Sequence, residues 1–549
     1  MATLLIPGRH LLTSEFMASY LTTVLGAQLS ELKWAGTVPT TIDSITQIII
    51  PITSANQHGS RYNPVPLYAR IAGLERTLAS VREHFDIHVV YVPVPHIQAT
   101  NNFADYLVKQ VAAEAGIYLE AKNTIVWTST DTLIEQFTKN GFSVLPAEWD
   151  MKEARYQEMP PTAIISELIK TPWGKENVAY SLVSEGTRSL WNDMREIPQH
   201  ILRLWNDPLL TDSGSLTDSR NYGVYTVGMG NHDVLDLKFN DIKSAIKEGK
   251  IVDEGCADGA LMVRLAATFP DSDIIGIDIT GEFVSRVEER QRAGDFGNSF
   301  VHVYQRNILE PIFADNSTDC VICNSTLHEV WSYGDGATSV RAYLAQKFAQ
   351  LKPGGRLVIR DVVGPKDKDR TVFMKLNNTD GLAANLPEGV IWKQGATSEL
   401  STQARFFRFA GEFLRDMRDS GRRGKETKLS FTVVDRDGAT YIQLPLASAM
   451  EFLSRKDYHE NWLSEMNEEF TFWDFDEWQK ELHAVGFSIA HDGTEPNAFS
   501  RSYQNEWIIK NRYEPSASLW VEESGKLLPY PFPVTTMVLV GEKPVIENL

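Results

Sequence analysis

Short apolar runs alternate with amphipathic stretches over residues 1–150. Four runs are short and hydrophobic enough to be strands buried on both faces of a sheet, namely 3–8, 47–53, 87–94 and 124–129. Helical patterns lie between them, for example from Tyr68 to Arg82 and from Asn102 to Ala113. Because strands that alternate with helices form parallel sheets covered by helices, we expect an α/β domain over 1–150.

Residues 151–235 do not continue this alternation. Pro160 and Pro161 open a helical stretch rich in tryptophan, and the polar segment 211–219 has the composition of a loop. We therefore predict a helical connector over 151–235.

The alternation of strands and helices resumes after residue 236 and is more regular than before. One helix face is predicted by the spacing of Leu235, Phe239, Ile242 and Ile246. Further strands are predicted to end at Asp253, at Asp278, near Asn307 and at Asn324. A helix at 339–351, the turn 351–355 and a fifth strand at 356–363 follow.

Regular alternation lapses over 366–473, and this stretch is dense in aromatic residues. The α/β pattern returns at Asp474, which has the spacing of a capping box with Glu477. Strands near 487–490 and 535–542 would complete the sheet. We interpret 366–473 as an insertion into one large domain that spans 236–549.

Composition and charge narrow the possible functions. The 549 residues are 43% hydrophobic and 10% aromatic, which excludes a disordered chain. The formal net charge is −19, which argues against a protein whose whole surface binds nucleic acid or anionic membranes. A local basic groove stays possible, because the segment 415–428 is either a solvated loop or a contact for substrate phosphates.

The small number of cysteines and the lack of targeting or membrane-spanning segments indicate the cell compartment. Three cysteines are too few for a disulfide framework and indicate a reducing compartment. The first residues do not have the basic start and apolar run of a secretory signal, and no apolar run of ~20 residues is present. We therefore expect a cytoplasmic protein that does not bind membranes, and we predict nothing about its oligomeric state.

The segment 251–265, IVDEGCADGALMVRL, carries the clearest chemical signal. A predicted strand leads to Gly255, Ala257 and Gly259, and a helix follows, so the backbone can turn tightly beside a ligand. The next strand ends at Asp278, 23 residues after Gly255, where a carboxylate can accept both hydroxyls of a ribose. A dinucleotide-binding turn would have glycine instead of Ala257, whereas a carboxylate at Asp253 suits a cationic ligand.

These motifs resemble those of the class I S-adenosylmethionine-dependent methyltransferases. The motif VDEGCADG (252–259) resembles the first motif of that family, and Asp278, the segment DCVICNSTLHEV (319–330) and the turn LKPGG (351–355) follow in the family's order. The resemblance covers roughly 230–365 and resumes over 474–549. It implies that S-adenosylmethionine is the cofactor, bound by Asp253, Gly255, Ala257, Gly259, Asp278, Ile279, Asn307, Ile308 and Asn324.

The resemblance also implies a role for each of these residues. The glycine turn would pass the methionine part, Asp278 would hold the ribose, and Asn307 would contact the adenine amino group. Asp253 would favour the positive end of the cofactor indirectly. Two alternatives stay open, because Asp253 could merely order the loop and Asp278 could merely cap the end of its strand.

The acceptor side of the site is predicted from two regions. His328 and Glu329 follow the fourth strand, where they could orient or deprotonate a substrate, or simply pack and bond locally. Tyr458 and Trp462, at positions i and i+4, would share a helix face in the insertion and stack on a planar acceptor. The insertion would then close over the acceptor site, or else form a private core.

Cys320 and Cys323 form a C-x-x-C pair, but we do not expect them to bind metal. They lie on a predicted strand, where residues three apart point to opposite faces. No second pair of ligands is near in the sequence. We interpret both as core residues and predict no metal site.

The first domain resembles the nicotinamide-mononucleotide adenylyltransferases and related nucleotidyltransferases. The residues that carry this resemblance over 1–150, as a nucleotide-like site, are Gly8, Arg9, His10, Ser54 and Asn63. The family's H-x-G-H motif would fall at 14–17, which reads Ser-Glu-Phe-Met instead. The fold is therefore expected without adenylyl transfer, and the domain either binds a nucleotide-like group or is structural.

The sequence thus predicts an α/β protein with two Rossmann-like doubly wound domains joined by a helical connector. The second domain would have a class I methyltransferase fold with a large insertion. It would methylate a small-molecule or nucleotide-like acceptor. Two alternatives stay open: an RNA-modifying methyltransferase that docks RNA on its first domain, and a scaffold protein that has lost catalysis and only binds nucleotide or cofactor.

Overall fold

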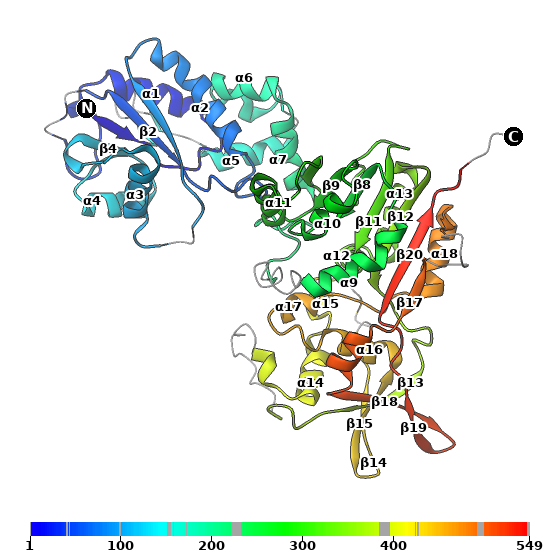
Figure 1. Ribbon diagram of the computed structural model, residues 1–549. Coiled ribbons are helices and arrows are strands. Elements are labelled where there is room, and N and C mark those ends of the chain that lie inside the picture. The colour runs from blue at the N-terminus through cyan, green and yellow to red at the C-terminus, as the bar shows by residue number, and fades with distance from the viewer. Residues whose placement is uncertain are drawn as a thin grey trace. The chain divides into compact units, whose positions relative to one another are not determined.

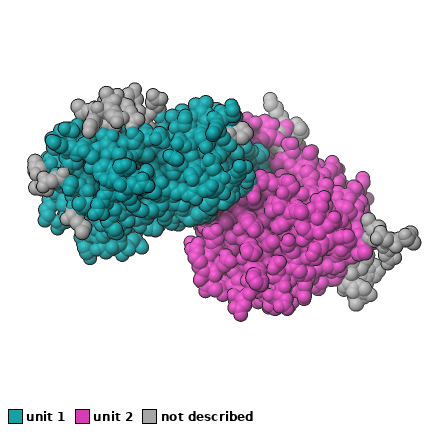
Figure 2. Space-filling model, turned by 90° about the horizontal axis from the view of Figure 1, so that it is seen from above, with its two compact units in different colours: residues 1–215 teal, residues 216–549 magenta. Residues whose placement is uncertain are grey.

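A computed structural model of the protein is drawn in Figure 1. It describes residues 2–39, 42, 44–97, 100–150, 155–156, 159–171, 173–220, 232–383, 396–422, 424, 428–490 and 499–545. The chain divides into two compact units, residues 1–215 and 216–549, which Figure 2 shows in different colours. None of the helices described in these ranges is both long and apolar enough to cross a membrane.

Unit 1 contains a five-stranded parallel sheet in the order β3-β2-β1-β4-β5. Its strands are β1 (Thr3–Leu5), β2 (Gln47–Ile52), β3 (His88–Pro93), β4 (Thr124–Trp127) and β5 (Ser143–Leu145). Its flanking helices are α1 (Glu15–Gly26), α2 (Leu67–Arg82), α3 (Phe103–Ala115) and α4 (Asp131–Lys139). Ile48 and Ile49 are neighbours in β2 but belong to different cores, so both faces of the sheet are buried. The predicted α/β character of this region is confirmed, and β5 is a strand that the sequence did not predict.

The later part of unit 1 is helical. Three helices follow the strands, α5 (Pro161–Lys170), α6 (Glu185–Asp193) and α7 (Glu196–Asn206), and a short hairpin, β6 (Trp149–Asp150) with β7 (Arg155–Tyr156), precedes them. These helices share a core with Leu11, Val65 and Ala69 of the preceding α/β part. Contact is close, because a Cβ at Gly186 would lie 2.3 Å from the Thr77 nitrogen. The helices over 161–206 therefore pack as part of unit 1.

Unit 2 is built on an eight-stranded sheet in the order β10-β9-β8-β11-β12-β20-β16, with β17 also paired to β20. Its strands are β8 (Lys250–Glu254), β9 (Asp273–Asp278), β10 (Val301–Gln305), β11 (Thr318–Asn324), β12 (Leu351–Val362), β16 (Ser488–Ile489), β17 (Arg501–Tyr503) and β20 (Thr536–Glu542). The pairs among β8, β9, β10, β11 and β12 are parallel, and β20 is antiparallel to β12. The predicted strands are thus confirmed, except that β12 begins at Leu351, so the predicted turn 351–355 belongs to that strand.

The helices of unit 2 cover both faces of this sheet (Figure 1). They are α9 (His232–Ile242), α10 (Ala260–Thr268), α11 (Gly281–Ala293), α12 (Leu327–Tyr333), α13 (Ala337–Gln350) and α18 (Phe475–Val485). The predicted capping box is confirmed, because the Asp474 side chain accepts from the Glu477 N–H and the Glu477 side chain accepts from the Asp474 N–H. Cys320 and Cys323 are both buried, in different cores on opposite faces of β11, as predicted.

The segment 366–473 is more regular than expected. A second sheet of unit 2, in the order β14-β15-β13-β18-β19, is built from β13 (Thr371–Leu376), β14 (Thr432–Arg436), β15 (Ala439–Pro445), β18 (Ala517–Glu523) and β19 (Lys526–Tyr530). Its helices are α14 (Thr402–Glu412), α15 (Arg415–Asp419), α16 (Leu446–Arg455) and α17 (Trp462–Glu465). The expected lapse of order is therefore wrong, because these short strands pair across long loops. Residues 517–530 join the same sheet, so the insertion has two parts.

The remaining short helical turns complete the described elements. In unit 1 they are η1 (Leu29–Glu31), η2 (Ala121–Asn123) and η3 (Val178–Ser181). In unit 2 they are η4 (Lys243–Ala245), η5 (Ala396–Glu399), α19 (Glu506–Ile508) and η7 (Ile509–Tyr513). Of the basic segment 415–428, residues 423 and 425–427 lie outside the described residues.

Candidate active site

The order of the strands in unit 2 places the site. The strands on one side of β8 run in the order β9, β10, and those on its other side run β11, β12, so the order reverses between β8 and β11. In open α/β sheets, ligands bind in the crevice outside the carboxyl ends of the strands at such a reversal. The loop after β8 carries Gly255 to Gly259, and the segment after β11 leads into α12.

The loop after β8 turns tightly at three positions. Gly255, Ala257 and Gly259 have φ values of 73°, 46° and 78°, in the left-handed region. Only the two glycines are free of steric cost there. A Cβ at Gly255 would lie 2.2 Å from the Thr326 hydroxyl oxygen, so this loop and the start of α12 touch through the glycine. The glycine turn is formed as predicted, with the strained Ala257 at its centre.

Asp278 holds this loop in shape. One carboxylate oxygen accepts the N–H of Ala257 at 3.0 Å, and the other accepts the N–H of Thr280 at 2.8 Å. Burial raises the pKa of Asp278 to about 6, although these two backbone hydrogen bonds oppose the shift. Each carboxylate oxygen has a second lone pair, so Asp278 can order the loop and still accept a ligand hydroxyl.

Asp253 adds a second buried negative charge beside the first. Its side chain is 1% exposed, and its Oδ2 has no hydrogen-bond partner among the described residues. Burial, together with the charges of Asp278 and Glu254, raises the pKa of Asp253 to about 7. An orphaned buried carboxylate oxygen in a negative site fits a ligand that brings positive charge, as the sulfonium and ammonium groups of S-adenosylmethionine do.

The other predicted cofactor residues lie at the ends of neighbouring strands. Ile279 follows β9, and its carbonyl accepts from the Gln305 side chain at 3.0 Å. Asn307 is buried, and its side-chain oxygen accepts the N–H of Leu309 at 3.0 Å. Ile308 and Asn324 follow β10 and end β11, respectively. The fold thus brings these residues to one edge of the sheet, and their individual contacts with the cofactor stay predictions.

His328 forms a hydrogen-bonded pair with Asp361, the last but one residue of β12. The His328 Nδ1 lies 2.7 Å from Asp361 Oδ1, while Asp361 Oδ2 accepts the N–H groups of Leu327 and His328 at 2.8 and 3.2 Å. The first N–H groups of a helix have no partner within it, so Asp361 caps α12 and orients the imidazole together.

The electrostatics of this pair favour a charged imidazole. Burial lowers the pKa of His328, but the charge and hydrogen bond of Asp361, with the charges of Glu468 and Glu329, outweigh it and raise the pKa to about 9. Burial raises the pKa of Asp361, but the charge and hydrogen bond of His328 and the backbone hydrogen bonds bring it below its ordinary value.

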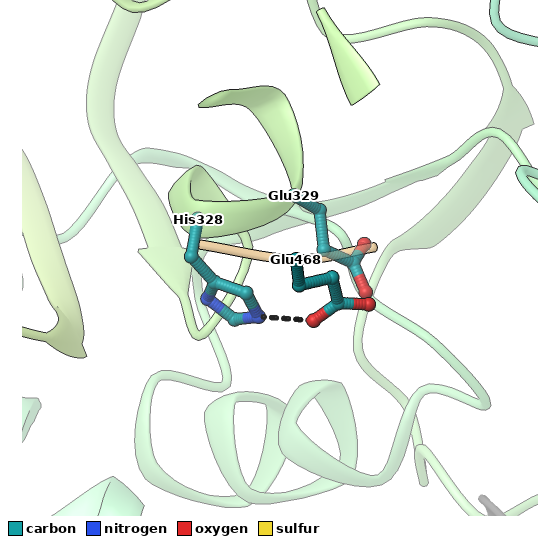
Figure 3. A group of neighbouring side chains, drawn as sticks. All are labelled: His328, Glu329 and Glu468. Atoms are coloured by element: carbon teal, nitrogen blue, oxygen red, sulfur yellow. Dashed lines mark ion pairs between the residues drawn. The ribbon is translucent and has the colours of Figure 1, made fainter. Parts of the chain in front are cut away.

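Two glutamates and an arginine complete the surroundings of the imidazole. Figure 3 shows the His328 ring and the Glu468 carboxylate pointing toward each other, and Nε2 lies 3.6 Å from Glu468 Oε2. The Arg220 guanidinium donates to Glu329 at 2.7 Å and to Glu468 at 2.5 Å. Possible ligand atoms of His328, Glu329 and Glu468 lie within 4.8 Å of one another, as in a metal site. Arg220, however, already gives both carboxylates a positive partner.

Glu465 adds a further buried acid, three residues before Glu468. Burial and the charge of Glu468 raise its pKa to about 8. Burial also raises the pKa of Glu468, against the opposing charge of Arg220. Both shifts favour the neutral carboxyl form, as expected where buried acids outnumber the positive groups beside them, and the same holds for Asp253 in β8.

The segment that carries Glu468 is held rigidly. The Glu451 carboxylate accepts the N–H groups of Phe470 and Thr471 at 3.0 and 2.8 Å and pairs with Arg455. The Phe470 ring lies 4.9 Å from the His328 ring in an edge-to-face arrangement. The insertion thus brings Glu468 and Phe470 against the imidazole and Glu465 near enough to interact with its charge, and we call these three residues the insertion face.

Tyr458 and Trp462 do not share a helix face, contrary to expectation. α16 ends at Arg455 and α17 begins at Trp462, so Tyr458 lies in the turn between them. Its ring lies 4.9 Å from the Arg512 guanidinium carbon. Trp462 is 2% exposed and donates its indole N–H to Glu412 at 2.8 Å. The i and i+4 spacing misled because a helix was assumed where the chain turns.

Four residues of this site were not singled out from the sequence: Asp361, Glu465, Glu468 and Arg220. Asp361 had a signal, because it is the one carboxylate within the apolar run 356–363, RLVIRDVV. A carboxylate at a core strand position needs a partner, which suggests a site. Arg220 and Glu468 had no such signal, because each lies in a polar stretch.

The predicted residues of unit 1 lie around the carboxyl ends of β1 and β2. Gly8 bridges to Ile52, Arg9 donates to the Tyr62 carbonyl at 2.7 Å, and the His10 ring contacts the Ile6 carbonyl at 3.0 Å. Two further contacts join Ser54 to His96 and Asn63 to Gln57, each at 3.0 Å. Each of these residues bonds a neighbouring residue of unit 1, and whether they also hold a nucleotide-like group stays a prediction.

Arg70 is the buried ion of this region, and the sequence did not single it out. Its guanidinium donates to four carbonyls, those of Arg9, Thr53, Ser54 and Gln57, at 3.0 to 3.3 Å. Ser14, at the place of the missing H-x-G-H motif, caps α1 by accepting the N–H of Met17 at 3.1 Å.

Comparison with known proteins finds a family match in part of the second unit. A family model described as a methyltransferase domain matches residues 246–404, and no curated protein matched the sequence. A solved S-adenosylmethionine-dependent methyltransferase from Methanosarcina mazei is 14% identical, with 55% of this chain and 97% of that chain covered at a TM-score of 0.28. The YcgJ protein from Bacillus subtilis is also 14% identical, with 57% and 100% covered at a TM-score of 0.27.

These two structural similarities are too low to carry an argument. The family model covers the glycine loop, Asp278, the His328–Asp361 pair and α13. The buried acidic loop fits the charge of S-adenosylmethionine. Residues 246–404 therefore carry a methyltransferase domain, and its buried acidic residues fit S-adenosylmethionine as the cofactor.

Proposed function

We propose that this enzyme methylates a hydroxyl group of a small-molecule or nucleotide-like acceptor, with His328 as the general base. The observation that carries the proposal is the 2.7 Å contact between His328 Nδ1 and Asp361. A carboxylate on one ring nitrogen fixes the tautomer and leaves the other nitrogen, Nε2, to accept a proton. The pair stands at the carboxyl edge of the sheet, beside the glycine loop.

S-adenosylmethionine, when bound, supplies an electrophilic methyl group. The protein aligns the acceptor oxygen with this methyl group, because methyl transfer depends mainly on alignment. It also removes the proton of the acceptor hydroxyl. His328 Nε2 takes the proton, and Asp361 and Glu468 balance the imidazolium that results. Since the pKa of His328 is raised to about 9, the fraction able to accept a proton grows as the pH rises toward that value.

The insertion face would form one wall of the acceptor site. Glu465, Glu468 and Phe470 approach His328 from outside the first sheet of unit 2, and Glu451 fixes the backbone that carries them. Tyr458 is proposed to bind the acceptor from the same insertion, whereas the buried Trp462 braces the insertion from within. We infer that the insertion closes over the acceptor site and shields it from water.

The acceptor class can be tested by label transfer. The purified enzyme is incubated with S-adenosylmethionine labelled in its methyl group and with either the small-molecule fraction or the total RNA of a cell extract. Labelled small molecules that disappear with His328→Asn support the proposal. Label in RNA would favour the RNA-modifying alternative. Binding of S-adenosylmethionine without transfer to either fraction would favour the scaffold alternative.

For unit 1 we propose a nucleotidyltransferase-like fold that binds a nucleotide-like group or serves as structure. Support comes from the reversal of strand order between β1 and β4, and from the gathering of Arg9, His10 and Ser54 at that edge. We further propose a cytoplasmic location, in keeping with three free, buried cysteines. The net charge of −19 weighs against nucleic acid as the main partner.

A further inference from the structure

A lysine and a glutamate are fully buried together beneath the cofactor edge of unit 2. Lys347 lies on α13, and Glu254 is the last residue of β8; both side chains are 0% exposed. The ammonium nitrogen lies 2.5 Å from Glu254 Oε1 and 4.9 Å from the centre of the Tyr343 ring. Removing two charges from water costs several kcal/mol per ion, so a buried pair is weak evidence for a stabilising role.

The position of this pair points to a different role. Glu254 directly precedes Gly255, so its side chain fixes the start of the glycine loop. The same ammonium group also donates to the Ile308 carbonyl at 3.1 Å, next to Asn307. One side chain therefore contacts the two segments that are predicted to hold opposite ends of the cofactor.

No ladder contact of the sheet could join these two segments. β8 and β10 are separated by β9, and strands lie about 4.8 Å apart, so the two strand ends are about 10 Å from each other. An ammonium group has three donors that can point in different directions, and here it reaches both segments from the side of α13. A leucine or methionine at this position would fill the space but join neither segment.

We propose that Lys347 is a positioning residue for S-adenosylmethionine, because it fixes the spacing between the Gly255–Gly259 loop and the Asn307–Ile308 segment. The inference rests on the proposed assignment of these two segments to the cofactor. A ligand that spans both segments gains affinity when their spacing is set before binding. A ligand that touches only one segment gains nothing from that spacing.

The test compares a spanning ligand with a fragment. In Lys347→Met/Glu254→Gln, neither charge is left unpaired in the core. Calorimetry measures the affinity of S-adenosylmethionine, and ligand-observed NMR measures that of adenosine. We expect the dissociation constant of S-adenosylmethionine to rise about tenfold and that of adenosine to change less than about twofold, as for the loss of preorganised two-point binding. The matched control is Arg356→Met/Glu542→Gln, a pair joined at 2.7 Å far from both segments, which should change neither.

Three results would overturn the proposal. An unchanged affinity for S-adenosylmethionine in a folded double variant would show that Lys347 positions nothing. An equal loss for both ligands would show a structural role only. If the double variant does not fold, Glu254→Asp replaces it; this variant keeps both charges and shortens the link by one methylene, and an unchanged ratio of the two affinities would again overturn the proposal.

The assignment of this sheet edge to the cofactor is tested separately. Asp278→Ala in the otherwise natural chain should lower the affinity for S-adenosylmethionine. If that variant binds the cofactor as the natural chain does, the site assignment itself fails, whatever Lys347 does.

Discussion

Two sheet edges in this protein share a strand order and differ in charge. In unit 1 the order is β3-β2-β1-β4-β5, and the first five strands of unit 2 run β10-β9-β8-β11-β12, which is the same arrangement. Both orders reverse beside their first strand, so both place loops around a crevice at the carboxyl edge. The strand order alone therefore does not explain what each edge can bind.

The buried ions at the two edges have opposite signs. In unit 2, burial is the main cause of the raised pKa values of Asp253 and Asp278, about 7 and about 6. In unit 1, burial and the charge of Arg9 lower the pKa of Arg70 to about 10. Each of these pKa shifts favours the neutral form of its group, as expected for a buried charge that lacks a full opposite charge beside it. A few buried charged residues thus make one edge suited to a cation and the other unsuited to it.

The largest effect is expected at the His328–Asp361 pair, which only unit 2 has. Asp361→Asn should lower methyl transfer by about 10²-fold or more, because the amide favours the wrong tautomer of His328. Its side-chain oxygen can still cap α12, so folding should be kept. The measurement is label transfer to the acceptor fraction, with cofactor affinity as the control. Transfer at the natural rate would remove His328 from the role of base.

A large loss of stability is expected at Trp462. Its indole is 2% exposed and bonded to Glu412. If it is a core residue, Trp462→Ala should lower the free energy of unfolding by about 3–5 kcal/mol, mainly through lost packing. Thermal melting with and without cofactor measures this. A variant that melts normally but loses turnover would instead place Trp462 in contact with the acceptor.

The two edges can be compared directly with the cofactor. Asp278→Ala should weaken the binding of S-adenosylmethionine by about 1–3 kcal/mol, because the ribose hydroxyls and the Ala257 N–H lose their acceptor. Arg70→Met in unit 1 removes a buried ion of opposite sign and should leave the affinity unchanged. Calorimetry measures the affinity of both variants for S-adenosylmethionine. Equal losses would show that general destabilisation, rather than the acidic edge, controls binding.

Two histidines should give opposite dependences of stability on pH. The pKa of His328 is raised to about 9, so its stabilising contribution is complete below about 6.5 and is lost as the pH rises through 9. The pKa of His10 is lowered to about 4 by burial, so His10 destabilises the fold as the pH falls below about 6.5. Melting curves of His328→Asn and His10→Asn against the natural chain, from pH 5 to pH 10, should differ most at the acidic end and with opposite signs, because His328→Asn loses a stabilising charge there and His10→Asn loses a destabilising one.

The last prediction concerns unit 1, which we expect to have no adenylyltransferase activity. The full chain should form no dinucleotide from ATP and nicotinamide mononucleotide, because Ser14 caps a helix where the histidine motif would stand. A coupled assay measures the product. Dinucleotide formation at the rates of an enzyme would show that another part of this edge performs the transfer.

The sequence predicted the features that depend on local pattern. Buried strands, the glycine turn, Asp278 and the capping box at Asp474 all follow from spacing within about 30 residues. Contacts over longer separations were missed. Asp361 is 33 residues from His328, and the second sheet of unit 2 pairs β13 with β18 across more than a hundred residues. Short strands with one exposed face carry too little pattern to specify such partners.

The place of β20 in the sheet constrains how the chain folds during synthesis. This strand, residues 536–542, lies between β12 and β16 and pairs with both. Until it has left the ribosome, β12 has an unpaired edge, and such edges invite association with other chains. Nascent chains stalled before residue 536 should therefore be captured by chaperones that recognise exposed strands. Emergence of residues 536–542 from the ribosome should end that capture.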